Sequence, residues 1–237
     1  MLYTQETVRD NIRNREGKRV FYLGKGDTLT PGARDFLRAE RIEVLDAALA
    51  KPEVYQLLGG GELREKPEHM THLYGNVLVH KTHPRIGFRG KMDLLESELL
   101  LCQLQLKEPV RGQVGEVLAL CRRLIRCDVL EEEVPEEPLC GLSQQQIRQR
   151  SHFPQDYYGQ PHFMPKYTDG LAVLQLNRCR CVARQVELMA VRAFADAEGN
   201  PTRVDILRAL NRVSSMLYLL MLQEKAKTDG RNYGAGS

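Results

Sequence analysis

Six cationic or imidazole side chains crowd into residues 80–93, which read His-Lys-Thr-His-Pro-Arg-Ile-Gly-Phe-Arg-Gly-Lys-Met-Asp. The proline and the two glycines predict a loop, and Asp93 is expected to open a helix after it. Cations on such a loop suit a polyphosphate, because the side chains supply charge and the backbone N–H groups at a helix start supply oriented donors. A solvated basic loop is the alternative. The four fixed cations are Lys81, Arg85, Arg89 and Lys91.

A second polar set lies within the two long helices predicted at the end of the chain. Arg180, Arg184 and Glu187 follow the i, i+4, i+7 spacing that aligns side chains on one helix face. Asn211 and Arg212 lie on the partner helix between apolar neighbours. These residues form either a surface ladder of ion pairs, which contributes little, or a polar seam where a helical bundle can build a site. Asparagine favours the seam, since it is a poor helix-interior residue without a polar partner.

Histidines recur around the basic stretch in the pattern H-x2-H-x7-H-x2-H, at His69, His72, His80 and His83. Neutral imidazoles could bind zinc or ferrous iron, but they could equally face solvent or phosphate. The spacing does not distinguish these readings. We therefore assign no metal site and keep His69, His72 and His80 as candidate ligands.

Composition narrows the class of protein. The net charge of +3, from 34 Lys and Arg against 31 Asp and Glu, argues against a general nucleic-acid binder. No apolar run is long enough to predict a membrane span, and the first residues lack the apolar core of a secretory signal. The six cysteines are scattered, which indicates reduced thiols in a cytosolic protein.

The order of predicted elements gives a mainly α chain with a small β-α-β extension at the N-terminus. Strands are expected at 18–23 and 41–45, around a helix that Thr30 caps and Pro31 begins. Gly59-Gly60-Gly61 predicts a linker. Four or five antiparallel helices then form a bundle, with Ser143 capping a short helix and Thr202 and Asp205 forming a capping box. The expected divisions are 1–58 (extension), 59–92 (linker and basic nucleotide loop), 93–227 (bundle) and 228–237 (flexible tail).

Residues 151–170 are rich in aromatic side chains, histidine and proline. An ordered loop with so much aromatic surface is usually either part of a core or the wall of a ligand site. The four aromatic candidates for such a wall are Phe153, Tyr157, Tyr158 and Phe163.

Four stretches carry short motifs in a fixed order. Residues 29–37 read LTPGARDFL and are followed by RIEV at 41–44; residues 69–73 read HMTHL and are followed by KTHPRI at 81–86 and FRGKMD at 88–93; R-x3-R-x2-E spans 180–187; and LNRVSSMLY spans 210–218. In this order the motifs resemble the ATP:cob(I)alamin adenosyltransferases. The resemblance is closest to the ethanolamine-utilisation type (EutT), which is related to the propanediol-utilisation type (PduO), and it spans most of the chain.

This resemblance implies a ferritin-like antiparallel helical bundle that assembles as a trimer or larger homo-oligomer, with ATP bound between subunits. The implied reaction is attack of cob(I)alamin on the 5′ carbon of ATP, which forms adenosylcobalamin and releases triphosphate. Arg180 and Arg184 would hold the phosphates and orient the ribose, Glu187 would contact the nucleoside, and Asn211 would complete the nucleotide pocket. Asp93 would pair with Arg180 across helices and shape the corrin side. The residues expected to cradle the triphosphate are Lys81, Thr82, His83, Arg85, Arg89 and Lys91.

The resemblance also implies apolar side chains beneath the corrin, for which Phe153, Tyr157, Tyr158 and Phe163 are the candidates. Some enzymes of this type hold a divalent metal through a cysteine cluster near the central loop, but here no cysteine precedes Cys102. Either the chain belongs to a metal-independent branch or histidines replace the thiolates. We favour the first, with Mg²⁺ on ATP as the only required ion.

The implied partners are a cob(II)alamin reductase and a B12-dependent lyase, with ethanolamine ammonia-lyase as the expected client. The implied location is the cytoplasm or the interior of a bacterial microcompartment. Two alternatives of another class stay open. One is a non-catalytic nucleotide- or corrinoid-binding protein of a microcompartment, and the other is a His-rich metal-binding bundle.

Overall fold

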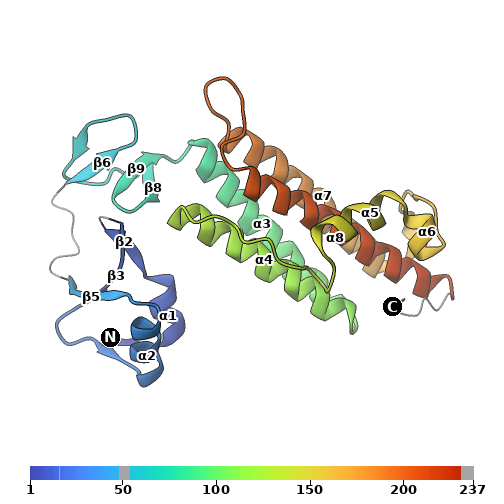
Figure 1. Ribbon diagram of the computed structural model, residues 1–237, viewed down its shortest axis with the longest axis horizontal. Coiled ribbons are helices and arrows are strands. Elements are labelled where there is room, and N and C mark those ends of the chain that lie inside the picture. Colours follow the sequence, from blue (N-terminus) through green and yellow to red (C-terminus); the bar gives the residue numbers. More distant parts are fainter. Residues whose placement is uncertain (16, 48–53, 231–237) are drawn as a thin grey trace. The chain divides into compact units, whose positions relative to one another are not determined.

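A computed structural model describes residues 1–15, 17–47 and 54–230, and the chain divides into two compact units, Met1–Lys81 and a second that begins at Thr82 (Figure 1). The described residues are mainly helical. The named strands all lie in the first unit, and the second is built from helices. The mainly α class with a small N-terminal α/β part is therefore confirmed.

The first part of the N-terminal unit contains the predicted β-α-β arrangement. Strand β3 (Lys18–Leu23) pairs in parallel with β5 (Glu43–Asp46), and helix α2 (Pro31–Ala39) connects them. Thr30 caps α2 by accepting from the Ala33 N–H at 3.3 Å, with Pro31 in the first turn. Further elements are β1 (Leu2–Tyr3), α1 (Gln5–Asp10), β2 (Arg13–Arg15) and β4 (Thr28–Leu29).

A small apolar core holds these elements together. Phe21 of β3 and Leu37 of α2 are almost fully buried within it, together with Val8, Ala33 and Ile42. The periodicities of strand and helix place these residues on facing sides, which is why the short motif could be predicted from sequence.

The prediction of a linker at the glycine run 59–61 is wrong, because this run is the turn of a β-hairpin. Gly60 and Gly61 have φ of 91° and 99°, which is the left-handed region that glycine adopts readily. They join β6 (Tyr55–Leu57) to β7 (Glu62–Leu63). The strands β8 (Met70–Tyr74) and β9 (Val77–His80) complete a second sheet in the order β7-β6-β9-β8.

The basic stretch is not a loop, which corrects the prediction for residues 80–93. Helix α3 spans Pro84–Gln105, so Arg85, Arg89 and Lys91 lie on its first turns and Asp93 lies within it. His83 is the N-cap, and its Nδ1 accepts from the Arg85 N–H at 3.2 Å. Proline is tolerated in the first turn of a helix because its missing N–H would have no partner there. The proline that suggested a loop is thus a helix start.

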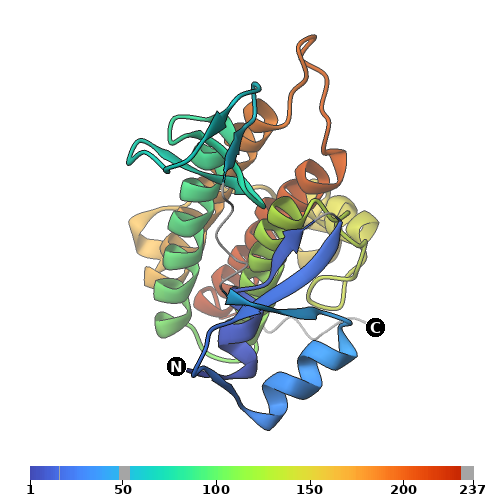
Figure 2. The same ribbon diagram turned by 90° about the vertical axis from the view of Figure 1, so that its left-hand side faces the viewer.

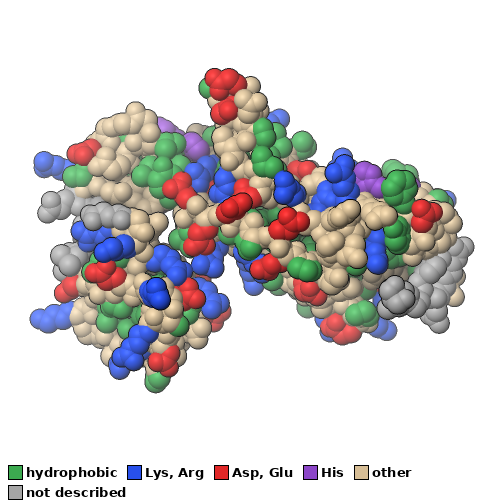
Figure 3. All heavy atoms as spheres, in the orientation of Figure 1, with side chains coloured by type: hydrophobic (Ala, Val, Ile, Leu, Met, Phe, Trp, Pro, Cys, Tyr) green, Lys and Arg blue, Asp and Glu red, His purple; other side chains and the backbone are tan. Residues whose placement is uncertain are grey.

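Helix α4 (Val110–Leu130) follows α3 and runs antiparallel to it, since Arg89 contacts Asp128 whereas Glu96 contacts Arg122. An acidic connector leads to helix α5 (Gln144–His152), which Ser143 caps as predicted, with Gln146 completing a capping box. Helix α6 (Pro154–Tyr158) and a 3-10 turn (Tyr167–Asp169) lie within the aromatic stretch. Figure 3 shows acidic side chains gathered on the face of the helices over which the connector runs.

Helices α7 (Leu171–Ala193) and α8 (Val204–Thr228) end the described chain. Their connection stands out from the helices in Figures 1 and 2. The capping box predicted for Thr202 and Asp205, where this connection ends, is wrong. Arg203 is the N-cap of α8, the Thr202 hydroxyl donates to Phe194 O at 2.9 Å, and Asp205 accepts from Arg203 instead.

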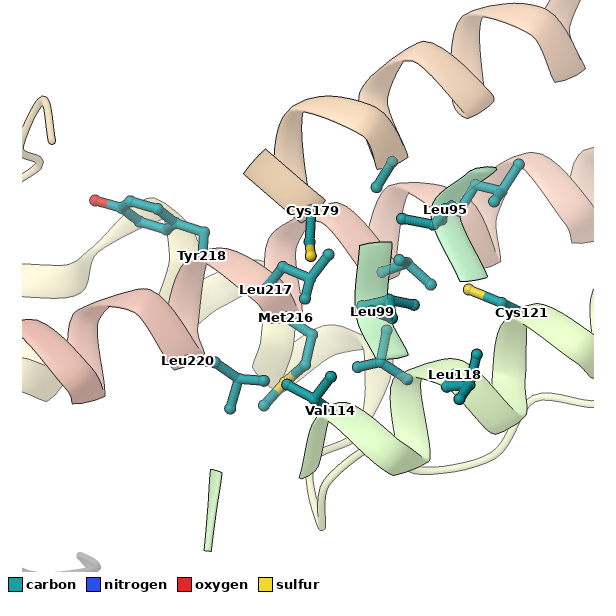
Figure 4. Packing of buried hydrophobic residues seen from close by; sticks show 14 of the residues in the cluster. Leu95, Leu99, Val114, Leu118, Cys121, Cys179, Met216, Leu217, Tyr218 and Leu220 are labelled. Carbon is teal, nitrogen blue, oxygen red and sulfur yellow. The ribbon is translucent and has the colours of Figure 1, made fainter. Parts of the chain in front are cut away.

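Helices α3, α4, α7 and α8 pack side by side around one apolar core (Figure 4). Leu95, Leu99, Val114, Cys121 and Leu217 are each fully buried there. Full burial of one leucine side chain stabilises the folded state by about 2 kcal/mol. The core therefore fixes the relative positions of α7 and α8. Among the described residues, no helix is both long and apolar enough to cross a membrane.

Candidate functional site between helices α7 and α8

The predicted polar seam exists, and it lies along the contact of α7 with α8. Asn211 Nδ2 of α8 donates to Glu187 Oε1 of α7 at 2.9 Å. Two turns along both helices, the guanidinium of Arg180 lies over the Tyr218 ring, 5.6 Å from its centroid. From the first contact to the second, the residue number rises along α8 and falls along α7. The two helices are therefore antiparallel.

The orientation of Asn211 is set by its neighbour. Arg212 Nη2 donates to Asn211 Oδ1, and Arg212 Nη1 donates to Gln144 O at 3.3 Å. An arginine can only donate, so it fixes the amide with its oxygen toward Arg212 and its nitrogen toward Glu187. Burial lowers the pKa of Arg212, as do the charges of Arg148 and Arg208, whereas Glu187 raises it.

The guanidinium groups of Arg180 and Arg184 have N–H donors that are not used in ion pairs within the described chain. Arg180 Nη1 donates to Asn177 Oδ1 at 3.2 Å, and Arg184 is exposed on the same side of α7. In the part of the chain that the structure describes, neither guanidinium forms an ion pair with a carboxylate. Two cations without acidic partners on one helix face suit an anionic ligand with several oxygens.

A profile of the cobalamin adenosyltransferase family matches residues 62–224. The chain belongs to this family. It is 27% identical to the corrinoid adenosyltransferase EutT of Salmonella typhimurium and 28% identical to that of Escherichia coli K12. Each alignment covers 94% of this chain and 92% of the relative, so the likeness includes the N-terminal unit. No solved structure gave a significant match.

The seam of this adenosyltransferase includes an aromatic cluster that the sequence did not predict. Tyr218 is only 8% exposed, and in Figure 4 its ring points away from the other labelled side chains. His162 Nδ1 lies 3.0 Å from Tyr218 Oη with the rings stacked, and Phe163 stacks on Tyr218 at 6.5 Å. The available signal was the position of Tyr218, two turns after Asn211 on the same helix.

The predicted corrin wall is only partly assembled. Phe163 joins the cluster at Tyr218, whereas Tyr158 is buried in the helical core. Phe153 and Tyr157 are 58% and 41% exposed, and the Tyr157 ring packs under Arg150 at 5.4 Å. The four aromatics are therefore not on one wall of a single chain, because helices α5 and α6 point them in different directions.

Arg85 and Arg89 bind a carboxylate that sequence analysis missed. Asp128 of α4 has no exposed surface, and it accepts from Arg85 Nε at 2.9 Å and from Arg89 Nε at 2.6 Å. The two arginines mainly offset the free-energy cost of removing the Asp128 carboxylate from water. The signal was present, because Asp128 continues the apolar spacing of Cys121 and Leu124 and so falls at a core position.

The remaining predicted phosphate ligands are dispersed. Lys91 Nζ reaches Gln185 Oε1 of α7 at 3.4 Å. Thr82 is exposed ahead of α3, and His83 is occupied as its N-cap. Lys81 is exposed and belongs to the N-terminal unit, where its N–H donates to His69 O at 2.9 Å.

Asp93 does not pair with Arg180 within the chain. Lys91 and Glu98 face α7, through Gln185 and Arg178, respectively. At about 100° per residue, Asp93 is rotated by roughly 200° from Lys91 and so faces away from α7. It is exposed beside Leu94, whereas Arg180 faces α8. The predicted pair of Asp93 with Arg180 across helices is therefore not formed within a single chain.

The candidate histidines do not converge. The rings of His69 and His80 lie 5.2 Å apart, and His72 packs against Tyr55 at 5.7 Å. Across the described ranges, no three His, Cys, Asp or Glu side chains are grouped so that they could hold a metal ion. Burial lowers the pKa of His72, and nearby Arg13 and Lys66 lower it further.

A hollow of about 610 Å³ lies at the end of the helices where α3 begins, lined by Arg85, Phe194 and Arg203 among others. It is separate from the seam, because no seam residue lines it. Within the seam, Arg184 is exposed, and Arg180, Glu187 and Asn211 are half-buried. The residues with free donors thus lie where a neighbouring molecule or subunit could complete the site.

Proposed function

We propose that this protein is a corrinoid adenosyltransferase that transfers the 5′-deoxyadenosyl group of ATP to cob(I)alamin. In this step the cobalt electron pair forms the Co–C5′ bond, the C5′–O bond breaks, and triphosphate leaves. The observation that carries the proposal is the α7–α8 seam, where Arg180, Arg184, Glu187 and Asn211 are grouped in a chain of this family.

The seam suits this chemistry because no proton has to be abstracted. Co(I) is itself the nucleophile, so the protein has to align the 5′ carbon and stabilise the leaving polyanion. Arg180 and Arg184 supply guanidinium donors for the triphosphate, which carries Mg²⁺. Glu187, held by Asn211, presents an acceptor for the nucleoside hydroxyl or amino groups. Phe163 is the aromatic candidate for the corrin side, since it alone of the four predicted aromatics lies at the seam.

The finer fold assignment is part of the proposal. Four long antiparallel helices around one core support a ferritin-like bundle. An adenosyltransferase of the ethanolamine-utilisation type would act in the cytoplasm or in a microcompartment. It would receive reduced corrinoid from a reductase and supply a B12-dependent lyase.

We also propose a homo-oligomer with shared sites, supported by the outer surfaces of α3 and α7. Leu94, Leu101 and Leu104 of α3 are 40%, 57% and 73% exposed, and Leu188 of α7 is 66% exposed. Apolar side chains repeated along one helix face suit a second copy of the chain. Asp93 lies on this face of α3, so its partner Arg180 would come from the neighbouring subunit.

Catalysis is tested by mixing the protein with MgATP and cob(I)alamin under a strong reductant and following the corrin absorption spectrum. Adenosylcobalamin should form, and Arg184→Ala should remove most of the activity without changing the melting temperature. Arg192→Ala is the matched control, because Arg192 is also exposed on α7 but lies beyond the seam. A folded protein that gives no product would refute the proposal.

Site sharing is tested by subunit complementation. Asp93→Ala and Arg184→Ala are each expected to be inactive alone. In mixed oligomers, about a quarter of the sites would combine two intact halves, so roughly that share of activity should return. Mixtures that stay inactive would show that each site is built from one subunit.

A further inference from the structure

Tyr218 lies at the seam but has no role in the reaction as proposed above. It lies two helical turns from Asn211, about 10 Å along α8. On α7, Arg180 lies two turns from Glu187, so the seam has two cross-helix contacts, Asn211 with Glu187 and Tyr218 with Arg180. The first contact orients a carboxylate, and the second orients a guanidinium.

The Arg180 guanidinium is restrained on two sides. Its central carbon, Cζ, lies over the Tyr218 ring, 5.6 Å from the ring centroid, and Asn177 Oδ1 accepts from Nη1 at 3.2 Å. A guanidinium is planar and carries five N–H donors in a fixed fork, so fixing its plane fixes the direction of the remaining donors. Without the ring, the side chain would keep its charge but lose this direction.

Tyr218 is itself held by the loop 159–170. His162 Nε2 lies 3.3 Å from His152 O, which can only accept, so Nε2 carries the proton. Nδ1 of the same ring lies within hydrogen-bond distance of the Tyr218 hydroxyl, at 3.0 Å. Burial raises the pKa of Tyr218, whereas the Phe163 backbone N–H and the charge of Arg180 lower it. The pKa of Tyr218 is raised overall above its ordinary value of 10.0, so the phenol keeps its proton at neutral pH and can donate a hydrogen bond to Nδ1.

The other end of this loop is also fixed to α8. Asp169 is 5% exposed, its Oδ2 accepts from Lys166 N at 2.7 Å, and its Oδ1 pairs with Lys225 of α8 at 3.2 Å. The loop thus has two anchors on one helix. Between them it brings Phe163 against Tyr218, at the Arg180 end of the seam.

We propose that Tyr218 is a positioning residue for adenosyl transfer. Its ring sets the plane of the Arg180 guanidinium toward the triphosphate, and its hydroxyl, through His162, fastens loop 159–170 beside the same end of the seam. This inference rests on the proposed function, since it assigns Arg180 to ATP.

Two substitutions separate the two roles. Tyr218→Phe keeps the ring and removes the hydroxyl, whereas Tyr218→Leu removes both. We expect Tyr218→Leu to raise the KM for ATP roughly 3- to 10-fold, as expected for loss of a partly buried cation–π contact, with kcat changed less. Tyr218→Phe should leave the KM for ATP within about twofold of the wild type.

The hydroxyl role has its own readout. Trypsin cleavage after the exposed Lys166 reports whether loop 159–170 is fastened. Tyr218→Phe and His162→Ala should each accelerate this cleavage, and the double variant should be no faster than either single one, because both remove the same hydrogen bond. Unchanged cleavage in Tyr218→Phe would overturn this half of the proposal.

The decisive control is the Arg180→Ala background. Arg184 remains in that variant, which keeps MgATP binding measurable by calorimetry. If Tyr218 acts through Arg180, Tyr218→Leu will not weaken ATP binding further in this background. An undiminished effect there would show a merely structural role and overturn the inference. Failure of the unmodified protein to form adenosylcobalamin would instead count against the proposed function.

Discussion

Asn211 on α8 and Glu187 on α7 form a hydrogen bond of 2.9 Å whose direction is dictated by Arg212. The amide oxygen accepts from Arg212, so only the amide nitrogen is left for Glu187. This relay turns an N–H donor toward Glu187, so Oε1 of Glu187 accepts from Asn211. It also joins the two helices at the centre of the proposed nucleoside site.

Asn211→Asp should disrupt this relay, because it places a second carboxylate against Glu187. Repulsion would displace Glu187 or protonate one of the pair, and the KM for ATP should rise at least about tenfold at pH 8. The rise should shrink at pH 6, where sharing a proton becomes easier. The measurement is the KM for ATP between pH 6 and 8.5.

Gln149→Glu is the control for Asn211→Asp. It makes the same amide-to-carboxylate change at an exposed position of α5. Its KM should match the wild type at each pH. An equal effect in both variants would mean that net charge, and not the contact with Glu187, is responsible.

Asp128→Asn should destabilise the helical unit, because the buried carboxylate compensates two arginines. Leaving buried charge without its counter-ion costs about 3 kcal/mol in free energy of unfolding. Urea denaturation followed by circular dichroism measures it. Glu132→Gln breaks the exposed pair with Arg126 (3.4 Å) and should cost less than about 1 kcal/mol. Equal midpoints for the two variants would contradict the structural role of Asp128.

His83→Asn should change how stability depends on pH. Burial lowers the pKa of His83 below its ordinary value of 6.5, as do Arg85 and Arg89, whereas Asp128 raises it. The unfolded chain therefore binds the proton more readily than the folded chain, and the stability from neutral His83 is lost as pH falls from about 6.5 through the folded pKa.

Asparagine caps helices well and does not titrate in this range. The wild type should thus lose more stability than His83→Asn between pH 7.5 and pH 5. Thermal melts at matched ionic strength give the comparison. Parallel curves for the two proteins would show that protonation of His83 is not linked to folding.

Removal of transition metals should leave the enzyme active. The described residues offer no three-ligand group, and His69 and His80 form a pair without a third ligand. After treatment with a chelator and restoration of Mg²⁺, activity should recover fully, and elemental analysis should find less than one zinc or iron per chain. Loss of activity that only zinc or ferrous iron restores, and that His69→Ala reproduces, would establish a histidine metal site.

Local pattern determined much of this protein. Ser143 as a helix cap and the alignment of Arg180, Arg184 and Glu187 depend on neighbours within a turn or two along the chain, so spacing alone predicted them. The β-α-β motif was also predicted, because each of its elements carries its own local pattern and start signal. The motifs also pointed to the adenosyltransferase family, to which the chain belongs.

Other features were decided by packing between segments far apart in sequence. Whether Arg85 and Arg89 were free for phosphate depended on Asp128, some forty residues later, which claims both. Whether Asp93 met Arg180 depended on which face of α3 turned toward α7. Tyr218 became part of the seam only because α8 runs antiparallel to α7 and loop 159–170 folds back on it. The spacing of residues along the chain thus determines which side chains share a helix face. Which partner they meet across that face depends on apolar packing between distant segments, and this packing cannot be read from local spacing.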